Sequence, residues 1–492
     1  MGSHRAIGAA ACVGAVAALV ISACDERKLA PLDGEEQDEA GADAGDPAPP
    51  RAEPGRHTVT VVETRRIVPS DGLPADARPD NSNNNLDVIR HAGRVFLAWR
   101  TAPDHFASDK TRIVVVSSED EITWRLEATF TAGTDLREPR LLALGDALFL
   151  YISELGNDPL RFEPRGVRFT RRGADGTWSA LAPALRTTRL AAPDRDAGAG
   201  DPDAGDPDAG TDAGDPDAST DAGTDAGDPD AGDPDAGTDA GAGGAPGDPM
   251  TGYIAWRTRT ERGVPYMTAY LGGEHIYAFD GLPLDVELLT TRDGVTWGPV
   301  GPTPESAVVY RGGGSETDFA IGDDGALFGV IRNEAGDTSG WGSKVCRAEA
   351  GALFRWTCVT DKKKYDSPLV FWHDGEAYLV GRRNVTETGD YDLGSRELSA
   401  QGETLKFQLD YRKRKKRCAI WRFVPGEQRV AYLLDLPSRG DTCFAARITT
   451  TSPTELAIYN YSSDVDGPDV SWADGQAGPT YVYRHLVRFS PR

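Results

Sequence analysis

Few of the residues that bind metals in proteins occur in this sequence. Its 492 residues include only seven histidines, and none of its six cysteines belongs to a Cys-x-x-Cys pair. The sequence also lacks a glycine-rich phosphate-binding loop and a Ser-His-Asp signature. We therefore expect no metal site and no cofactor, and the common nucleotide-binding and serine-hydrolase motifs are excluded.

Positive charge is in short supply as well. Lysine and arginine total 53 against 77 aspartates and glutamates, which gives a formal net charge of −24. A surface of this sign repels nucleic acid and anionic lipid, so neither is expected as a partner. The segment 194–248 alone holds 17 aspartates and one arginine, or −16, and the rest of the chain carries only −8. The net charge is therefore a poor guide to the folded surface.

An apolar segment long enough to span a membrane is missing too. The longest apolar run, from Ile7 to Val20, is short for a hydrocarbon layer of about 30 Å. It follows a short polar start and ends in Ile21-Ser22-Ala23-Cys24, as is typical of a secretory signal. This ending resembles the bacterial lipoprotein signal, which implies removal of residues 1–23 and lipidation of Cys24. A plain signal peptide with an incidental cysteine is the alternative.

The resemblance also implies a location: the bacterial cell envelope, outside the cytoplasm, with membrane contact through the lipid anchor only. Disulfides are permitted there. The four cysteines that follow Cys24 allow three pairings. We favour Cys346 with Cys358 and Cys418 with Cys443, because each pair flanks segments that read as neighbouring strands. Free buried thiols are the alternative.

Two segments have almost no large apolar residues. Residues 24–57 consist mainly of Glu, Asp, Ala, Gly and Pro, and residues 194–248 repeat DPDAG and TDAG. Such sequences cannot bury enough surface to offset the entropy of ordering, so we expect a disordered tether and a disordered insertion. A calcium-binding repeat is disfavoured because the Gly-Gly-x-Gly-x-Asp pattern and apolar positions are absent.

The remaining sequence reads as β-strands almost throughout. Short apolar or aromatic segments such as 95–99, 147–151, 326–331 and 377–380 each follow a turn that contains Gly or Asp. No amphipathic helix of useful length is found, and two basic runs, 362–364 and 412–417, are interpreted as solvated charge, the second in a projecting hairpin. The pattern predicts an all-β sandwich, barrel or propeller.

A repeated turn pattern favours the propeller. Residues 118–124 and 291–297 share Ser/Thr-x-Asp-x-x-Thr-Trp, and residues 174–178 carry a shorter copy. These turns resemble the Asp-boxes (BNR repeats) of sialidase-like β-propellers. In that motif the Asp and hydroxyl residues tie a hairpin turn and the Trp packs between strands, so the boxes are expected to be structural and peripheral.

A second repeat places polar residues at the start of one strand and the end of the next. A hairpin brings these two points to the same end of a sheet, so both sets are expected to surround the axial opening. The pairs are Asp87 with Arg100, Arg137 with Tyr151, Glu316 and Asp318 with Arg332, Asp366 with Arg382, and Asp441 with Tyr459. Six blades are predicted within residues 58–492, at 86–133, 134–183, 184–303, 304–360, 361–437 and 438–490.

The resemblance to the sialidase superfamily covers about residues 85–490 apart from the acidic insertion. In sialidases three arginines hold the substrate carboxylate, an Asp protonates the leaving group, and a Tyr assisted by Glu attacks the anomeric carbon. Arginine suits this task because its fork binds both carboxylate oxygens. The resemblance implies catalytic candidates Glu316, Asp87, Asp318, Asp366 and Tyr459. It implies substrate-binding candidates Arg100, Arg137, Arg332, Arg382, Arg383 and Asn384.

The sequence departs from the sialidase pattern at two places. Sialidases open the first blade with Arg-Ile-Pro, where this chain has residues 83–87, Asn-Asn-Asn-Leu-Asp. The nucleophilic Tyr is replaced by Phe444, which cannot attack, so Tyr459 or Tyr461 on the next strand would have to act instead.

Two functions follow from these residues. The first is a possible exo-alpha-sialidase-like glycoside hydrolase that acts on an acidic or other glycan at the axial face. The second is a non-catalytic propeller lipoprotein that binds a glycan or a protein there. In either case a glycan or glycoconjugate is the expected partner and a monomer the expected state.

Overall fold

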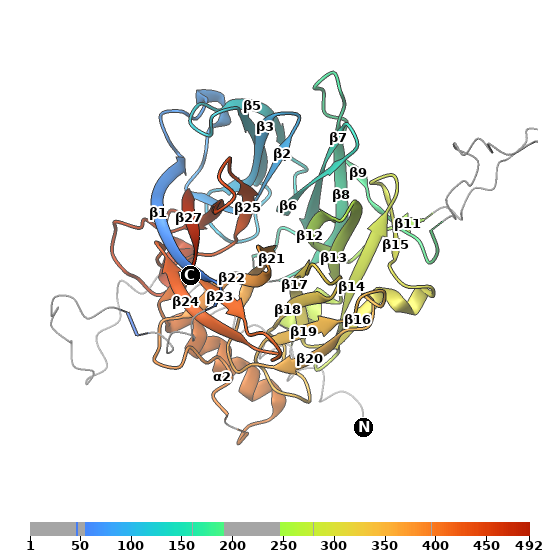
Figure 1. Ribbon diagram of the computed structural model, residues 1–492, viewed down its shortest axis with the longest axis vertical. Coiled ribbons are helices and arrows are strands. Elements are labelled where there is room, and N and C mark those ends of the chain that lie inside the picture. The colour runs from blue at the N-terminus through green and yellow to red at the C-terminus, as the bar shows by residue number, and fades with distance from the viewer. Residues whose placement is uncertain (1–45, 48–54, 160, 191–246, 279, 395) are drawn as a thin grey trace, which may run out of the picture.

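The computed structural model describes residues 46–47, 55–159, 161–190, 247–278, 280–394 and 396–492. Within these ranges the chain folds mainly into β-strands, which form six sheets set around a common centre (Figure 1). Almost all neighbouring strands are antiparallel, and the inner strands of successive sheets lie side by side. This arrangement is a β-propeller, so the prediction of an all-β propeller is confirmed. The expected signal (1–23), Cys24, nearly all of the tether, and residues 194–246 of the insertion lie outside the described residues.

The first four strands of each sheet are named below in order from the innermost strand outward. The first two sheets hold β2 (Ser82–His91), β3 (Arg94–Ala102), β4 (Arg112–Ser118) and β5 (Arg125–Phe130), then β6 (Asp135–Leu144), β7 (Ala147–Leu155), β8 (Pro164–Arg172) and β9 (Ala182–Pro183). The third holds β12 (Ile254–Glu261), β13 (Val264–Leu271), β14 (Leu284–Thr291) and β15 (Thr296–Pro299), with β10 (Leu185–Arg186) and β11 (Asp248–Pro249) at its outer edge and β16 (Val308–Gly312) paired to β14.

The last three sheets follow the same plan. They hold β17 (Gly314–Ile321), β18 (Leu327–Asn333), β19 (Lys344–Ala348) and β20 (Thr357–Thr360); β21 (Asp366–His373), β22 (Glu376–Asn384), β23 (Lys416–Phe423) and β24 (Val430–Leu436); and β25 (Ala446–Thr449), β26 (Glu455–Ser462), β27 (Tyr481–Pro491) and β1 (His57–Val68). The helices are α2 (Ala400–Lys413) and α3 (Trp472–Ala477), with 3-10 turns η1 (Ala75–Ala77), η2 (Gly273–Ile276) and η3 (Pro304–Ala307).

The sixth sheet joins the two ends of the described chain. Strand β1 pairs with β27 along nearly its whole length, from His57 opposite Pro491 to Val68 opposite Val482. The sequence did not predict this strand, because the first blade was expected to begin at residue 86. Pairing of an N-terminal strand with the C-terminal one closes the ring and covers the edge that β27 would otherwise expose.

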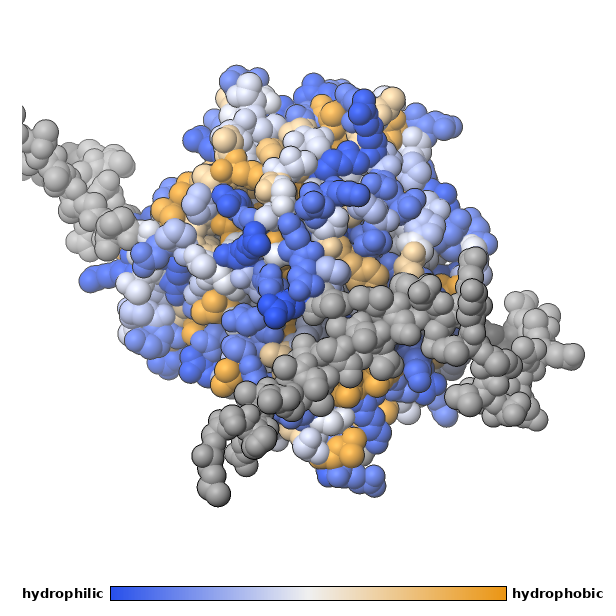
Figure 2. All heavy atoms as spheres, turned by 180° about the vertical axis from the view of Figure 1, so that it is seen from behind, coloured by the Kyte–Doolittle hydropathy of each residue, from blue (hydrophilic) through white to orange (hydrophobic). Residues whose placement is uncertain are grey.

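The core lies between the sheets. In β3, both the odd and the even residues from Val95 to Trp99 are almost fully buried, because each sheet packs against a neighbour on both faces. This explains why such strands read as continuous apolar runs rather than as alternating ones. The outer surface is largely hydrophilic with scattered apolar residues (Figure 2). Among the described residues, no helix is long and apolar enough to cross a membrane.

Helix α2 contradicts the expectation that no helix of useful length is present. Its buried residues are Glu403, Thr404, Phe407, Gln408 and Tyr411, which have helical spacing but include three polar residues. A helix of this kind shows no apolar stripe in the sequence. Ser399 caps its first turn by accepting the backbone N–H of Gly402 at 3.2 Å. The basic run 412–417 is therefore the end of α2 and the start of β23, not a projecting hairpin.

The third sheet also differs from the prediction. Its blade was expected at residues 184–303, but β16 (Val308–Gly312) also pairs with β14, and β12 is the innermost strand. Strands β10 and β11, which precede and follow the undescribed residues 191–246, pair with each other at the outer edge. The acidic insertion therefore connects to the propeller at its periphery.

The two turns with the Ser/Thr-x-Asp pattern share one hydrogen-bond arrangement. Asp120 Oδ1 accepts the backbone N–H groups two and three residues later at 2.8 Å each, and Asp293 Oδ1 does so at 2.8 and 2.7 Å. Each turn joins the third and fourth strands of its sheet, so it lies away from the centre. Trp124 and Trp297, which end the two patterns, are buried.

Both predicted disulfides are present. Cys346–Cys358 joins the paired strands β19 and β20, and Cys418–Cys443 joins β23 of the fifth sheet to the segment before β25 of the sixth. The second disulfide therefore links two sheets, close to the end at which the inner strands begin.

Candidate functional site

Polar side chains gather where the inner strands begin and the second strands end. Five inner strands have a register shift near their start, and Asn85, Glu138 and Ser367 have positive φ there. Bulges of this kind redirect side chains out of the regular alternation. We call this end of the propeller the polar end; its principal residues are Glu138, Glu316, Arg332, Glu334, Lys364, Asp366, Arg382 and Asp441.

A chain of ion pairs runs from the fourth sheet to the fifth. Arg332 Nη1 lies 2.7 Å from Glu316 Oε1 and 2.9 Å from Glu334 Oε2. Glu334 Oε1 lies 3.0 Å from Lys364 Nζ, which is 3.6 Å from Asp366 Oδ1. The predicted pairing of Glu316 with Arg332 is therefore present, but Arg332 is shared with a second carboxylate.

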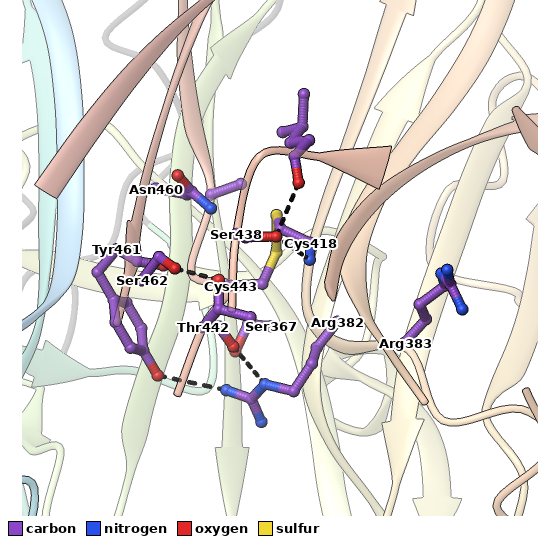
Figure 3. Close-up of a disulfide and its surroundings, with 12 residues drawn as sticks. Ser367, Arg382, Arg383, Cys418, Ser438, Thr442, Cys443, Asn460, Tyr461 and Ser462 are labelled. Carbon is purple, nitrogen blue, oxygen red and sulfur yellow. Dashed lines mark hydrogen bonds between the residues drawn. A yellow bond between two sulfur atoms is a disulfide. The ribbon is translucent and has the colours of Figure 1, made fainter. Parts of the chain in front are cut away.

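The network continues into the sixth and first sheets. Arg382 lies 3.0 Å from Asp366 Oδ2 and donates to the Tyr461 hydroxyl at 3.3 Å. Tyr461 donates in turn to Asp441 at 3.0 Å, and Asp441 lies 2.7 Å from His105 Nδ1. Figure 3 shows Arg382 directed toward Tyr461, beside the disulfide that links the two sheets.

Arg100 and Arg137 also lie at the polar end, but both of them pair with the same carboxylate, that of Asp135. Asp135 Oδ1 lies 3.0 Å from Arg100 Nη2, and its other oxygen accepts from Arg137 Nε. Arg137 further donates to the backbone carbonyl of His105 at 2.9 Å. Arg100 is fully buried, so it is a structural residue rather than a ligand-binding one.

Glu316 holds its proton more tightly than an ordinary carboxyl. Burial raises the pKa of Glu316 to about 7, opposed by Arg332 and assisted by the neighbouring carboxylates of Asp366 and Glu138. Burial acts on Glu334 in the same direction, but Arg332 and Lys364 hold the pKa of Glu334 far below its usual range. Carboxyl groups whose environments push their pKa values apart are typical of acid–base sites.

Helix α2 covers part of the polar end. Gln408 donates to Glu334 at 2.7 Å, and the Tyr411 hydroxyl donates to Asp366 at 2.6 Å. The side chain of Asp366 is consequently 1% exposed and that of Arg382 6% exposed. The side chains of Glu316, Arg332 and Glu138 retain 10–12%. Solvent therefore reaches the network on the side of Glu138 and Glu316, not at Asp366 and Arg382.

Two predicted binding residues point away from this end. Arg383 Nε and Nη2 lie 2.7 and 2.5 Å from the two carboxylate oxygens of Asp435, and Asn384 donates to the carbonyl of Asp390 at 3.0 Å. Successive residues of a strand face opposite sides, so Arg382 and Arg383 cannot serve one site. Figure 3 shows their side chains diverging. These contacts give no support to the assignment of Arg383 and Asn384 to substrate binding, which stays a prediction.

Tyr459 is a structural residue of the opposite end. Its hydroxyl donates to Glu121, within the Asp120 turn of the first sheet, at 2.7 Å. Tyr151 of β7 makes the equivalent bond to the carbonyl of Gly294, within the Asp293 turn, at 2.7 Å. In both cases a Tyr on a second strand donates a hydrogen bond to the turn of the next sheet around the ring. This contact gives no support to the catalytic assignment of Tyr459, which stays a prediction.

Asp87 and Asp318 brace the middle of the inner strands. Asp87 accepts the backbone N–H of Leu141 at 2.9 Å, and Asp318 accepts that of Val370 at 2.8 Å. Each bond links one inner strand to that of the next sheet. Asp318 also accepts two bonds from Arg259 at 2.6 Å each. These carboxyl groups hold the sheets together, and their contacts give no support to their predicted role as proton donors.

Several residues of the polar end were not singled out in the sequence. Lys364 belongs to a basic run interpreted as solvated charge, yet it is 2% exposed. Glu334 follows Arg332 by two residues, and that proximity was an available signal. Glu138 becomes a site residue only because the bulge in β6 redirects it, which the sequence does not reveal. The described residues contain no group of three or more His, Cys, Asp or Glu side chains that could hold a metal ion.

Comparison with known proteins relates this fold to solved propellers. No family model and no curated protein matches the sequence. A crystal structure of a protein of unknown function from Dyadobacter fermentans superposes with a TM-score of 0.50 and 12% identity, covering 88% of this chain and 99% of that one. This likeness supports the fold alone.

Two sialidase structures also match. The complex of Trypanosoma rangeli sialidase with sialic acid gives a TM-score of 0.44 and 9% identity, with 83% of this chain covered and 54% of that one. The phage phi92 endosialidase gives 0.44 and 10%, with 89% and 70% covered. The chain thus spans about half the length of the T. rangeli enzyme.

Proposed function

We propose that this chain is a glycoside hydrolase of the bacterial cell envelope that acts on a glycan at the polar end of a six-bladed propeller. The observation that carries the proposal is a pair of carboxyl groups, Glu138 and Glu316, that reach the polar end from two different sheets and have side chains 11–12% exposed. Glycoside hydrolysis commonly requires two carboxyl groups, one to donate a proton and one to activate or replace the nucleophile.

Glu316 is the proton donor in this proposal. A general acid is most effective when its pKa lies near the working pH, and the pKa of Glu316 is raised to about 7. Its other oxygen accepts the backbone N–H of Ser367 at 2.7 Å, which fixes the orientation of the carboxyl group. Arg332, at 2.7 Å, limits the rise in pKa and balances the charge left after proton transfer.

Glu138 is the second carboxyl group. Its Oε2 atom has no hydrogen-bond partner among the described residues, and the nearest cation, Arg140, lies 3.7 Å away. The Oε2 atom is itself buried, whereas the side chain as a whole is 12% exposed. The Glu138 carboxylate also contributes to the raised pKa of Glu316, so the two groups interact electrostatically.

A tyrosine nucleophile is not part of the proposal. Phe444 packs against the Trp256 ring at 5.0 Å between centroids and under the guanidinium of Arg140, so it serves the core. Tyr461 is held by Arg382 and Asp441, but it is 2% exposed. The two-carboxyl chemistry therefore replaces the sialidase arrangement that the sequence suggested.

Non-catalytic binding of a glycan is the second candidate. The observation that favours it is charge pairing, because Arg332, Arg382, Arg100 and Arg137 each already have a protein carboxylate. An acidic sugar would have to compete with those carboxylates for the guanidinium groups. Such a site binds through hydroxyl and ring contacts rather than through a free arginine triad.

A panel of fluorogenic glycosides, with sialosides included, distinguishes the two candidates. The hydrolase proposal predicts turnover of at least one substrate, and Glu316→Gln should lower kcat by about 10² to 10⁴-fold. Glu427→Gln is the matched control, because Glu427 is exposed and remote from the polar end. Binding of glycans without turnover of any glycoside would reject the hydrolase and favour the binding module.

A further inference from the structure

A second site is suggested by a cavity of about 500 Å³ on the propeller axis, at the end opposite the polar end. Its walls come from the last residues of β2, β6, β12 and β25, together with Leu369 of β21. Cavities that bind small molecules typically measure about 300–1,000 Å³. The exposed residues Thr260 and Thr449 lie at its mouth, so solvent can enter.

The cavity walls carry an excess of positive charge. Four arginines line it against two carboxyl groups, and the lining includes Arg257, Arg259, Arg447 and Glu261. The other carboxyl belongs to Asp87, whose pKa is raised by burial, opposed by Arg257, so its negative charge is weakened further. Low-dielectric walls of one sign concentrate the field and favour ligands of the opposite sign.

Of the four arginines that line the cavity, Arg447 is the one without a counter-ion among the described residues. Its guanidinium makes no ion pair or hydrogen bond with any residue that the structure describes, and its nearest recorded partner is the Phe371 ring, at 5.0 Å from the centroid. Burial and the nearby Arg259 lower the pKa of Arg447 to about 10, against the opposing effect of Glu261 and Asp318, so Arg447 stays charged at neutral pH. A half-buried charge beside other cations is unfavourable until an anion pairs with it.

A second guanidinium group, that of Arg257, has an N–H group without a hydrogen-bond partner. Arg257 is 4% exposed and donates from Nη2 to the carbonyls of Pro368 and Ala445 at 3.1 Å each, but its Nε has no hydrogen-bond partner. Asp318 lies 3.3 Å from that Nε without the alignment of a hydrogen bond. A buried N–H group left in this state is available to a ligand atom or a water molecule.

We propose that the axial cavity binds a small molecule through a carboxylate or phosphate group, with Arg447 as the principal anion-binding residue. The planar guanidinium offers two parallel N–H donors that match either oxyanion. Arg257 and Arg259 supply the surrounding positive potential while they brace the sheets. The site lies on the far side of the ring from Glu316, so it is independent of the proposed hydrolysis.

Isothermal titration calorimetry on the mature full chain tests the site. The probes are inorganic phosphate, citrate and glucuronate, with neutral glucose as the comparison, so that the two oxyanion types are told apart. At least one anion should bind and glucose should not. Arg447→Ala should weaken binding about 10- to 100-fold, as expected for loss of a charged hydrogen-bonding pair. Arg355→Ala, at an exposed position in another turn, is the matched control and should change nothing.

A second variant guards against misfolding as an explanation. Glu261→Gln removes a carboxylate from the cavity wall and should strengthen anion binding several-fold, which a damaged fold cannot do. Glu316→Gln should leave anion binding unchanged, and Arg447→Ala should leave glycoside turnover unchanged. The inference is overturned if no anion binds, if glucose binds equally well, or if Arg355→Ala weakens binding as much as Arg447→Ala.

Discussion

Glu316 is the residue on which the proposed chemistry depends, and its surroundings explain why. It begins the inner strand β17, where a bulge lets it face both Arg332 on the paired strand and the backbone of Ser367 in the next sheet. Burial, assisted by two neighbouring carboxylates, raises the pKa of Glu316 to about 7, while Arg332 prevents a larger shift. A side chain with this balance can donate a proton and take it back.

The pH dependence of turnover follows from this pKa. Glu316 donates a proton only while it is protonated, and its pKa is raised to about 7. The value of kcat/KM for glycoside hydrolysis should therefore fall as the pH rises through about 7. A pH–rate profile measures this fall. The residual activity of Glu316→Gln should not fall in the same pH range. A rate that rises through pH 7 would contradict the role of acid.

For Tyr459 we predict an effect on stability and none on catalysis. Tyr459→Phe removes the hydroxyl that donates to Glu121 at 2.7 Å, far from the polar end. The free energy of unfolding should fall by about 1–3 kcal/mol, as for a buried hydrogen bond to a charged group, with kcat unchanged. Tyr151→Phe, which loses the equivalent bond to Gly294, is the control and should behave alike. A large loss of kcat in Tyr459→Phe alone would restore Tyr459 as a catalytic residue.

The choice between Tyr459 and Tyr461 shows what single residues reveal in a sequence. The two tyrosines are two positions apart on β26, so they share a face and cannot be separated by their alternation pattern. Tyr461 joins Arg382 and Asp441 at the polar end, whereas Tyr459 reaches the Asp120 turn of the neighbouring sheet. The pairing of Glu316 with Arg332 could be inferred because it lies within one hairpin. Contacts between residues of different sheets could not be inferred from the sequence.

At the scale of elements, the strands of the blades were easier to infer from the sequence than helix α2 or the N-terminal strand β1. The strands are short, apolar and bounded by turns, so they are visible without any tertiary information. Helix α2 is hidden because much of its buried face is polar, and because Gln408 and Tyr411 on that face bind Glu334 and Asp366 in distant segments. Strand β1 is hidden because its partner β27 lies at the other end of the chain. In both cases the missing information is a contact between distant segments.

The disulfide between the fifth and sixth sheets should affect both stability and activity. Cys418 and Cys443 are 25 residues apart, and closing such a loop stabilises a fold by about 3 kcal/mol. Replacing both by Ser should lower the free energy of unfolding by about that amount. Activity should fall as well, because Thr442 holds Arg382 through its carbonyl. Urea unfolding and glycoside turnover, measured on one preparation, give the two quantities.

The Cys346–Cys358 pair is the control for that experiment. It closes a 12-residue separation between paired strands of a single sheet, away from the polar end. Loop entropy alone predicts a comparable loss of stability for its double Ser variant, about 3 kcal/mol. Turnover should stay unchanged. Equal losses of activity in the two variants would show that the disulfide between sheets has no special role at the site.

At the scale of the whole molecule, two ends of one ring have different chemistry. The polar end has alternating acids and bases that neutralise one another, with Glu138 and Glu316 at its open side. The opposite end has an axial cavity with excess arginine. The same inner strands provide both ends, because their first residues face one and their last residues face the other. A propeller of this kind can hold two independent sites.

Attachment to a membrane is a prediction about the complete chain. If Cys24 carries the lipid, the protein should sediment with membranes, since each buried CH₂ of an acyl chain contributes about 0.8 kcal/mol. Cys24→Ala should release the protein into the soluble fraction, as measured by fractionation and immunoblotting. Cys12→Ala, within the expected signal, is the control and should leave the protein attached. Membrane association that persists in Cys24→Ala would reject the lipoprotein hypothesis.

The most direct test of the central claim is a crystal structure of the Glu316→Gln variant with the glycan that the glycoside panel identifies. The account predicts a sugar ring at the polar end, between Glu138 and the side chain at position 316, with the glycosidic oxygen within hydrogen-bond distance of the latter. A sugar bound at the rim of the ring, or in the axial cavity of the opposite end, would contradict it.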